Sequence, residues 1–263
     1  MDALVGERRI SYDARGLAEP TADVPHVSEV SGETAVFDAA GLTTRQINLE
    51  LRSLLYEQGV KDVTVKNPGS KHSIGVGILT RCKITYEGSL GYFGCGLIDG
   101  PEVHITGRVG WSACENMMSG VVVIESNAGS LTGAALRGGD IVVKGRVGAR
   151  SGIDQKGGTI ITLGSVGSMT GFMMQRGRQI ICEDAGPGLG DSMYDGIIYV
   201  GGKVKALGID CVPGEWTEAD SELIDRKFRI YELGSPPEFQ KFVCGKKLYN
   251  YDNLEPAERK LVL

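Results

Sequence analysis

Four segments of eight residues decide the fold of this chain: VHITGRVG at 103–110, VVIESNAG at 122–129, IVVKGRVG at 141–148 and IITLGSVG at 160–167. Each segment begins 19 residues after the one before it, and each ends in glycine. Val, Ile or Thr occupies the first and third positions of every segment. This period-two alternation of β-branched residues predicts a strand. Its return at a fixed interval predicts a solenoid.

The same register extends well beyond these segments. One glycine column, which returns every 19 residues, comprises Gly91, Gly110, Gly129, Gly148, Gly167 and Gly186. Nineteen residues are too few for a strand with a packed helix, but they suit one all-β coil. Coils of this kind stack about 4.8 Å apart, and we expect the recurring glycines at their corners. The predicted fold is therefore an all-β parallel β-helix of about seven coils between residues 72 and 204.

The composition agrees with this prediction and excludes other classes. The chain has 263 residues with 39 glycines and 6% aromatics, whereas glycine within helices would destabilise a helical bundle. The net charge of −5 does not favour a nucleic-acid binder. The six cysteines are far apart in the sequence, which favours reduced thiols over disulfides or a metal site. With no leader-like start and no long apolar run, we expect a cytoplasmic protein that does not contact a membrane.

Flanking segments complete the predicted organisation. The four expected units are an extended N-terminal arm at 1–42, a helix with a lead-in strand at 43–71, the β-helix at 72–204 and a C-terminal cap with a helix at 205–263. The first helix is expected from about Thr43 to Gln58, with Thr44 as its N-cap, and the second from Thr217 to about Tyr231. Because the end rungs of a solenoid need covering, both helices are expected to cap them.

One outward column is unusually apolar. It lies between two inward columns and consists of Val123, Val142, Ile161, Ile180 and Tyr199. An apolar ladder of this length must be covered, either by a terminal segment of the chain or by another subunit. These five residues are therefore a candidate partner interface.

Signals of chemistry are weaker than those of structure. Residues 186–190 (GPGLG) resemble a phosphate loop, but their glycines belong to the repeat. Cys95 and Cys114 fall on adjacent rungs, where a column of small residues explains them. His104 faces outward without a predicted catalytic partner. Arg108 and Arg146 share an outward column of mixed charge that we interpret as a solvated face. No catalytic, cofactor-binding or metal-binding residue is predicted.

Several less repetitive stretches resemble a known family. The glycine pattern is similar to the GXGXG domain, the C-terminal right-handed β-helix of the glutamate synthase large subunit. The stretches 115–120 (ENMMSG), 171–175 (GFMMQ), 190–194 (GDSMY), 207–212 (LGIDCV) and 247–252 (KLYNYD) resemble the free-standing form of this domain. That form is the second subunit of N-methylglutamate synthase, also called methylamine–glutamate N-methyltransferase. Gln179 and Glu183 interrupt the columns and predict a local irregularity.

The resemblance implies a division of labour within a hetero-oligomer. An amidotransferase-like subunit and an FMN-binding glutamate-synthase-like subunit, with an iron–sulfur cluster, would carry the chemistry, while this chain braces them. It would be a non-catalytic scaffold without a cofactor of its own, most consistent with N-methylglutamate synthase. Two alternatives keep the fold: the β-helix subunit of glutamate synthase proper or of formylmethanofuran dehydrogenase. A third is a β-helix carbohydrate-active enzyme with its own site.

Overall fold

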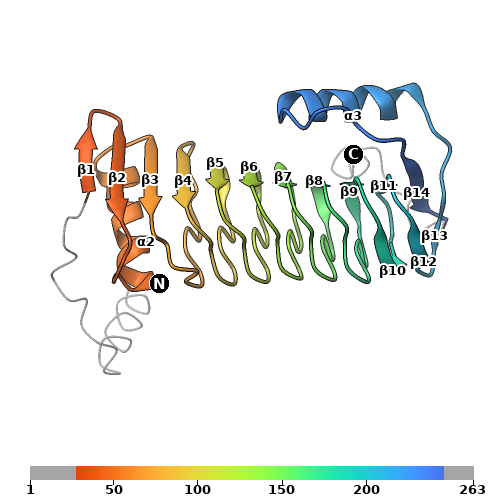
Figure 1. Ribbon diagram of the computed structural model, residues 1–263, viewed down its shortest axis with the longest axis horizontal. Coiled ribbons are helices and arrows are strands. Elements are labelled where there is room, and N and C mark those ends of the chain that lie inside the picture. Colours follow the sequence, from red (N-terminus) through yellow and green to blue (C-terminus); the bar gives the residue numbers. More distant parts are fainter. Residues whose placement is uncertain (1–27, 246–263) are drawn as a thin grey trace, which may run out of the picture.

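The computed structural model describes residues 28–245 (Figure 1). Most of its elements are short strands. In chain order they are β1 (Ser28–Ser31), β2 (Thr34–Asp38), α2 (Thr44–Arg52), the π-helix η1 (Ser53–Glu57), β3 (Asp62–Lys66), β4 (Lys83–Glu87), β5 (Asp99–Ile105), β6 (Ser119–Ile124), β7 (Asp140–Val143), β8 (Lys156–Thr162), β9 (Arg176–Ile181), β10 (Ala185–Leu189), β11 (Ile197–Val200), β12 (Val204–Leu207), β13 (Cys211–Pro213), α3 (Glu218–Ile230) and β14 (Gln240–Cys244).

A parallel β-solenoid forms the body of the molecule, as the sequence predicts (Figure 1). Strands β2 to β9 and then β11 pair in parallel, one rung after another, along a single long sheet. From β4 to β11 the paired residues lie 19 positions apart, as in Ile84 with Val103 and Val103 with Val122, except for two pairs 20 apart beside register shifts, Asp99 with Ser119 and Lys156 with Arg176. This inward column is buried along its whole length, at Ile84, Val103, Val122, Ile141, Ile160, Gln179 and Ile198.

The solenoid begins earlier than the repeat predicts. Strands β2 and β3 belong to the same parallel ladder, which gives about eight turns. Residues 28–38 are thus a hairpin joined to the sheet, whereas the sequence led us to expect an arm over 1–42. The spacing hides this rung, because Ala35 pairs with Val63 and Val63 with Ile84, at intervals of 28 and 21 residues. Residues 1–27 of the expected arm and 246–263 of the expected cap lie outside the described part.

Each rung also has a turn in which the backbone alternates in handedness. Phe93, Cys95 and Leu97 all have positive φ, from 55° to 57°. The N–H groups of Phe93 and Leu97 donate to Trp111 O and Glu115 O on the next rung, both at 2.8 Å. The N–H group of Cys95 donates to Ile74 O on the previous rung, at 2.9 Å. These bonds to both neighbouring rungs offset the strain of the left-handed backbone. Positive φ therefore does not require glycine at this turn.

The regular glycine column has a different cause, which is close approach between rungs. At Gly167, which does not have positive φ, a Cβ atom would lie 2.5 Å from Ala149 N and 2.7 Å from Gly148 C. The other glycines of its column from Gly110 to Gly186 face the backbone of the preceding rung in the same way. A side chain there would push the stacked backbones apart.

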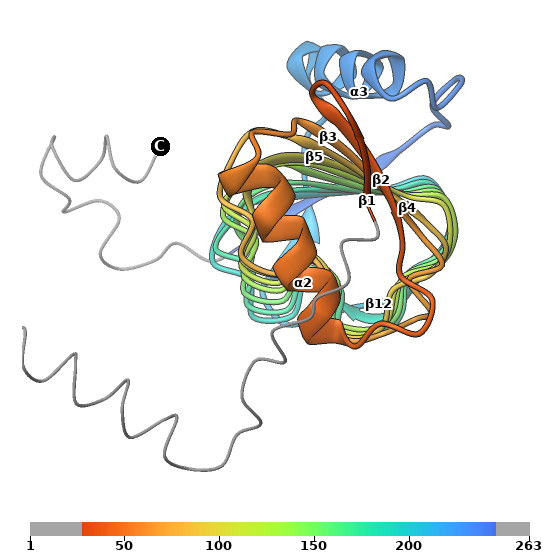
Figure 2. The same cartoon turned by 90° about the vertical axis from the view of Figure 1, so that its left-hand side faces the viewer.

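Helix α2 caps the N-terminal end of the solenoid (Figure 2). Its N-cap is Thr43, one residue before the predicted position, in a capping box with Gln46. Asn48 donates to Ser73 O and accepts from Gly75 N, both at 2.8 Å. Gly75 is the equivalent of Cys95, whose N–H donates to Ile74 O on the preceding rung. No rung precedes Gly75 at this turn, so the Asn48 side chain supplies the acceptor instead.

The C-terminal end differs from the prediction. Strand β14 pairs antiparallel with β11 and β13, so two antiparallel strands, which α3 separates in the chain, end the long sheet. Helix α3 forms over the predicted residues, but it does not cap the end. It lies along the outer face of the sheet, parallel to the long axis (Figure 1).

The interior is polar near the irregularity predicted at Gln179. Gln179 is buried and donates from Nε2 to Ser151 O at 3.1 Å. Buried Gln155 donates to Gly157 O at 2.8 Å. The next rung turns through β10, whose pairing with β12 shifts register between Pro187 and Leu189. Hydrogen bonding to backbone oxygens allows each amide to occupy its own, otherwise apolar column: Gln179 lies between Ile160 and Ile198, and Gln155 between Leu136 and Met174.

Close rung stacking predicts the effect of Gly167→Ala. We expect this change to lower the free energy of unfolding by about 1–3 kcal/mol, because the new Cβ overlaps fixed backbone atoms. The matched control is Gly94→Ala, where φ is again not positive and the nearest atoms, in the Leu90 side chain, lie 3.2 Å away. Chemical denaturation would measure both. Equal stabilities of the two variants would contradict the stacking constraint.

Candidate functional site

The predicted apolar ladder exists and is covered by the chain itself. Strand pairing places Val123, Val142, Ile161, Ile180 and Tyr199 in one outward column. All but Val123 are buried in a cluster with Ile224 and Phe228 of α3, and Val123 packs at its margin. Of the two coverings expected, the structure therefore shows a terminal segment. The expected partner interface is corrected to an intramolecular contact at four of its five residues.

Local sequence explains why α3 forms and how it lies. Thr217 and Asp220 make a capping box, with acidic residues in the first turn and basic residues in the last. Ile224 and Phe228 are four residues apart, so both face the sheet. The helix runs from β11, near Tyr199, back toward β7 at Asp140.

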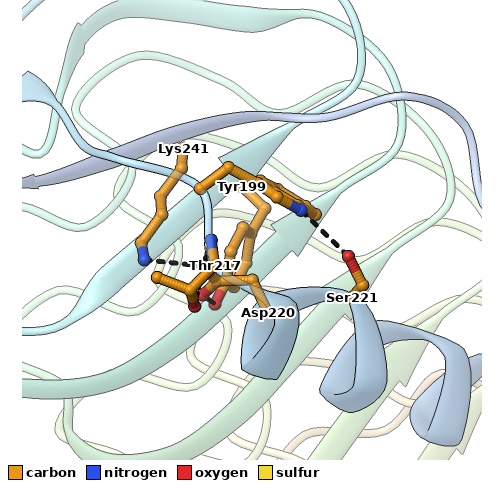
Figure 3. Close-up of polar contacts among 6 residues, drawn as sticks. Tyr199, Thr217, Asp220, Ser221 and Lys241 are labelled. Atoms are coloured by element: carbon orange, nitrogen blue, oxygen red, sulfur yellow. Dashed lines mark hydrogen bonds and ion pairs between the residues drawn. The ribbon is translucent and has the colours of Figure 1, made fainter.

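Asp220 anchors the beginning of α3 (Figure 3). Its carboxylate accepts from Tyr199 Oη at 2.6 Å, from Lys241 Nζ at 2.7 Å and from Thr217 N at 2.7 Å. Asp220 is 5% exposed, and the Lys241 side chain 10%. Burial alone would raise the pKa of Asp220, but the hydrogen bonds from Lys241, Tyr199 and Thr217 outweigh it and hold the pKa well below its usual value. The carboxylate is thus a charged, fully partnered anchor.

Asp140 on β7 anchors the other end of the helix. Lys227 and Tyr231 both donate to its Oδ2. Burial and the neighbouring Asp140 charge raise the pKa of the Tyr231 phenol. The helix is therefore fixed at both ends, with an apolar contact between them.

A groove of about 380 Å³ remains where α3 ends. Val121, Val123 and Ile230 form its apolar part, and His104 lies at its polar side. His104 Nε2 lies 2.8 Å from Glu125 Oε1, and Lys144 Nζ lies 2.8 Å from Glu125 Oε2.

This histidine has the carboxylate partner that the sequence did not indicate. Burial would raise the pKa of Glu125, but Lys144 and His104 outweigh burial and lower it. The signal was present in the register, because Glu125 lies outward on the rung that follows His104. A histidine paired with a carboxylate can transfer a proton, or it can form an ionic contact with a charged group of another molecule.

The two cysteines on adjacent rungs are buried free thiols. Burial raises the pKa of Cys95 to about 12 and that of Cys114 well above its usual value. Both share a turn position that glycine occupies on later rungs, beginning with Gly133. Their environment favours a structural role over a nucleophilic one.

The mixed outward column stabilises rungs as well as facing solvent. Ser89, Asn127 and Asp184 each accept a hydrogen bond from the backbone N–H one rung later, at 2.8–3.1 Å. In the same column Arg108 and Arg146 supply two of those N–H groups. Residues 186–190 belong to β10 and its end, not to a phosphate loop before a helix.

Over residues 28–245, no group of three or more His, Cys, Asp or Glu side chains lies close enough to hold a metal ion. No helix within this described range is long and apolar enough to cross a bilayer.

Comparisons with known proteins give one partial relative. Protein GlxC of Rhizobium meliloti (strain 1021) is 37% identical over 72 residues, which are 27% of this chain and 31% of GlxC. The match thus spans about a third of the length of that curated relative. No family model and no solved structure matches the chain.

The Asp220 anchor predicts a pH-dependent loss of stability. We expect Asp220→Asn to lower the free energy of unfolding by roughly 3 kcal/mol near neutral pH, because Lys241 loses its charged partner. A lowered folded-state pKa stabilises the fold above the unfolded-state value of about 3.9, and this contribution is lost as pH falls further. The difference from the wild type should therefore shrink below about pH 4 in denaturant titrations.

Asp225→Asn is the control, since Asp225 is exposed on the same helix. It should change stability by less than about 0.5 kcal/mol. A pH-independent cost for Asp220→Asn would show that its charge does not anchor α3.

The buried thiols predict slow alkylation. Near pH 8, raised pKa values leave Cys95 and Cys114 almost wholly protonated, so iodoacetamide should modify them far more slowly in the native protein than after unfolding. Mass spectrometry of peptides would measure both rates. Partly exposed Cys244 is the internal reference. Rapid native labelling of either buried thiol would contradict their structural role.

Proposed function

We propose that this chain is a non-catalytic scaffold subunit of a glutamate-synthase-type complex. The observation that carries the proposal is that side chains along the columns of the β-solenoid already have structural roles. Columns that could hold chemistry are occupied by packing, by rung-to-rung hydrogen bonds and by thiols with raised pKa. Such a body is suited to holding other subunits in place.

The sequence resemblance and one relative support the type of complex. The partial match to Protein GlxC supports the glutamate-synthase-type family. Within that family, the resemblance favours N-methylglutamate synthase, which forms N-methylglutamate and ammonia from methylamine and glutamate. An amidotransferase-like subunit and an FMN-binding subunit with an iron–sulfur cluster would then be the partners.

Isolation of the assembled complex tests the proposal. We expect the tagged full-length chain to copurify with a flavin-containing subunit, detected by absorbance and mass spectrometry. The complex should convert methylamine and glutamate to N-methylglutamate. Conversion of glutamine and 2-oxoglutarate instead would indicate glutamate synthase proper. A chain that purifies without any flavin-containing companion would contradict the proposal.

The groove beside α3 allows a separate test of the non-catalytic role. If the chain is a scaffold, Glu125→Gln in the assembled complex should leave turnover within about twofold of the wild type. Loss of an acid–base group would instead slow turnover by about a hundredfold or more. Glu115→Gln, on a turn away from this groove, is the matched control. Activity of the isolated chain on a polysaccharide would favour a carbohydrate-active enzyme.

A further inference from the structure

A second concavity lies where three successive strands begin. It has a volume of about 350 Å³ and spans the starts of β8, β9 and β11. Its walls combine two arginines with glycines: Arg176, Arg178, Gly157, Gly158, Gly177 and Gly196. It does not include His104 or the groove at the end of α3.

Both arginines lack a carboxylate partner. Neither Arg176 nor Arg178 forms an ion pair with any residue in the described part of the chain. Asp195 also lines the concavity, but it is not within ion-pair distance of them. Arg178 Nε is buried and has no hydrogen-bond acceptor among the described residues. A buried N–H donor without an acceptor costs free energy, so an acceptor that reaches Arg178 Nε would stabilise this arginine.

Neighbouring charges leave the site cationic. Lys241 is neutralised by Asp220, and Lys156 by Asp154. The Arg178 guanidinium lies beside the Tyr199 phenol, and its charge and a hydrogen bond lower the pKa of that phenol, which burial and Asp220 raise. Asp195 is the one carboxylate among the described residues of the wall, against two guanidinium groups. The excess positive charge suits an anion.

Glycines bring backbone atoms to the wall of this site. They are required by the rung geometry, since a Cβ at Gly177 would lie 2.5 Å from Gln155 Nε2 and 2.6 Å from Gly157 O, and one at Gly157 would lie 2.2 Å from Arg137 O. As a result, backbone rather than side chains forms the wall next to the arginines.

We infer that this concavity binds an oxyanion, the carboxylate or phosphate group of a small molecule, between Arg176 and Arg178. Guanidinium groups bind such planar or tetrahedral oxygen groups through paired, charge-assisted hydrogen bonds. The bound oxygens would supply the acceptor that Arg178 Nε lacks. This inference does not depend on the scaffold role or on the identity of the complex.

Binding of simple anions to the full-length chain tests the site. Inorganic phosphate and acetate, each at an ionic strength matched with sodium chloride, are the probes, and calorimetry and melting temperature are the readouts. We expect saturable binding of at least one probe and a higher melting temperature. Binding of phosphate alone would assign a phosphate ester, and binding of acetate alone would assign a carboxylate.

Variants assign the binding to the two arginines. Arg176→Gln should weaken binding roughly tenfold or more, because a charge-assisted hydrogen bond is lost. Arg178→Lys keeps the charge but removes the planar donor group, and should also weaken it. Arg150→Gln, at an exposed arginine elsewhere on the solenoid, should bind like the wild type.

Melting of each variant without anion reports its folding independently of the ligand. Because the Arg176 side chain has no hydrogen bond to a described residue, its removal leaves no partner unpaired. No binding of either probe, or equal binding by the wild type and Arg176→Gln, would overturn the inference.

Discussion

The structure depends on the close stacking of one rung on the next. In the long sheet, strands separated by about 4.8 Å place every residue beside its equivalents on the neighbouring rungs. The consequence differs by position: branched apolar side chains fill the interior, and Ser, Asn or Asp accepts a backbone N–H from the next turn. Where the backbones themselves approach, as at Gly167, only glycine fits. The abundance of glycine therefore reflects the close packing of a rigid solenoid and not a flexible chain.

Departures from the repeat mark places with an additional role. Gln155 and Gln179 introduce hydrogen-bonded amides into the core. The outward column becomes apolar from Val123 onward because α3 covers it. Arg176 and Arg178 bring two cations without carboxylate partners to a surface that the rung geometry leaves open. In a repetitive body, such exceptions are the most informative positions.

The outer face of the sheet is divided by α3. The helix buries the C-terminal part of the ladder and is fixed at each end by a carboxylate on or facing the sheet, Asp140 and Asp220. The N-terminal part remains accessible and includes the groove lined by His104, whose imidazole pairs with Glu125. For the proposed scaffold, this division limits which part of the face is free to meet another subunit. The arginine concavity lies at the starts of β8, β9 and β11, apart from that groove.

The sequence by itself determined the solenoid, its 19-residue register, the inward columns and the residues that form α3, but not where that helix packs. These are local or strictly periodic properties, so each repeat provides independent support for the others. It did not determine the first rungs, because Ala35, Val63 and Ile84 pair at irregular spacings.

Only the tertiary structure decided what covers the apolar ladder, because an apolar face attracts a helix of the same chain or another subunit equally well. It also decided the pairing of His104 with Glu125 and of Asp220 with Lys241. Such contacts join residues 21 positions apart in the chain, on separate rungs or elements, and depend on how side chains meet across them. The tertiary structure likewise decided that Arg178 Nε is buried without an acceptor, because this depends on every group that packs around the atom.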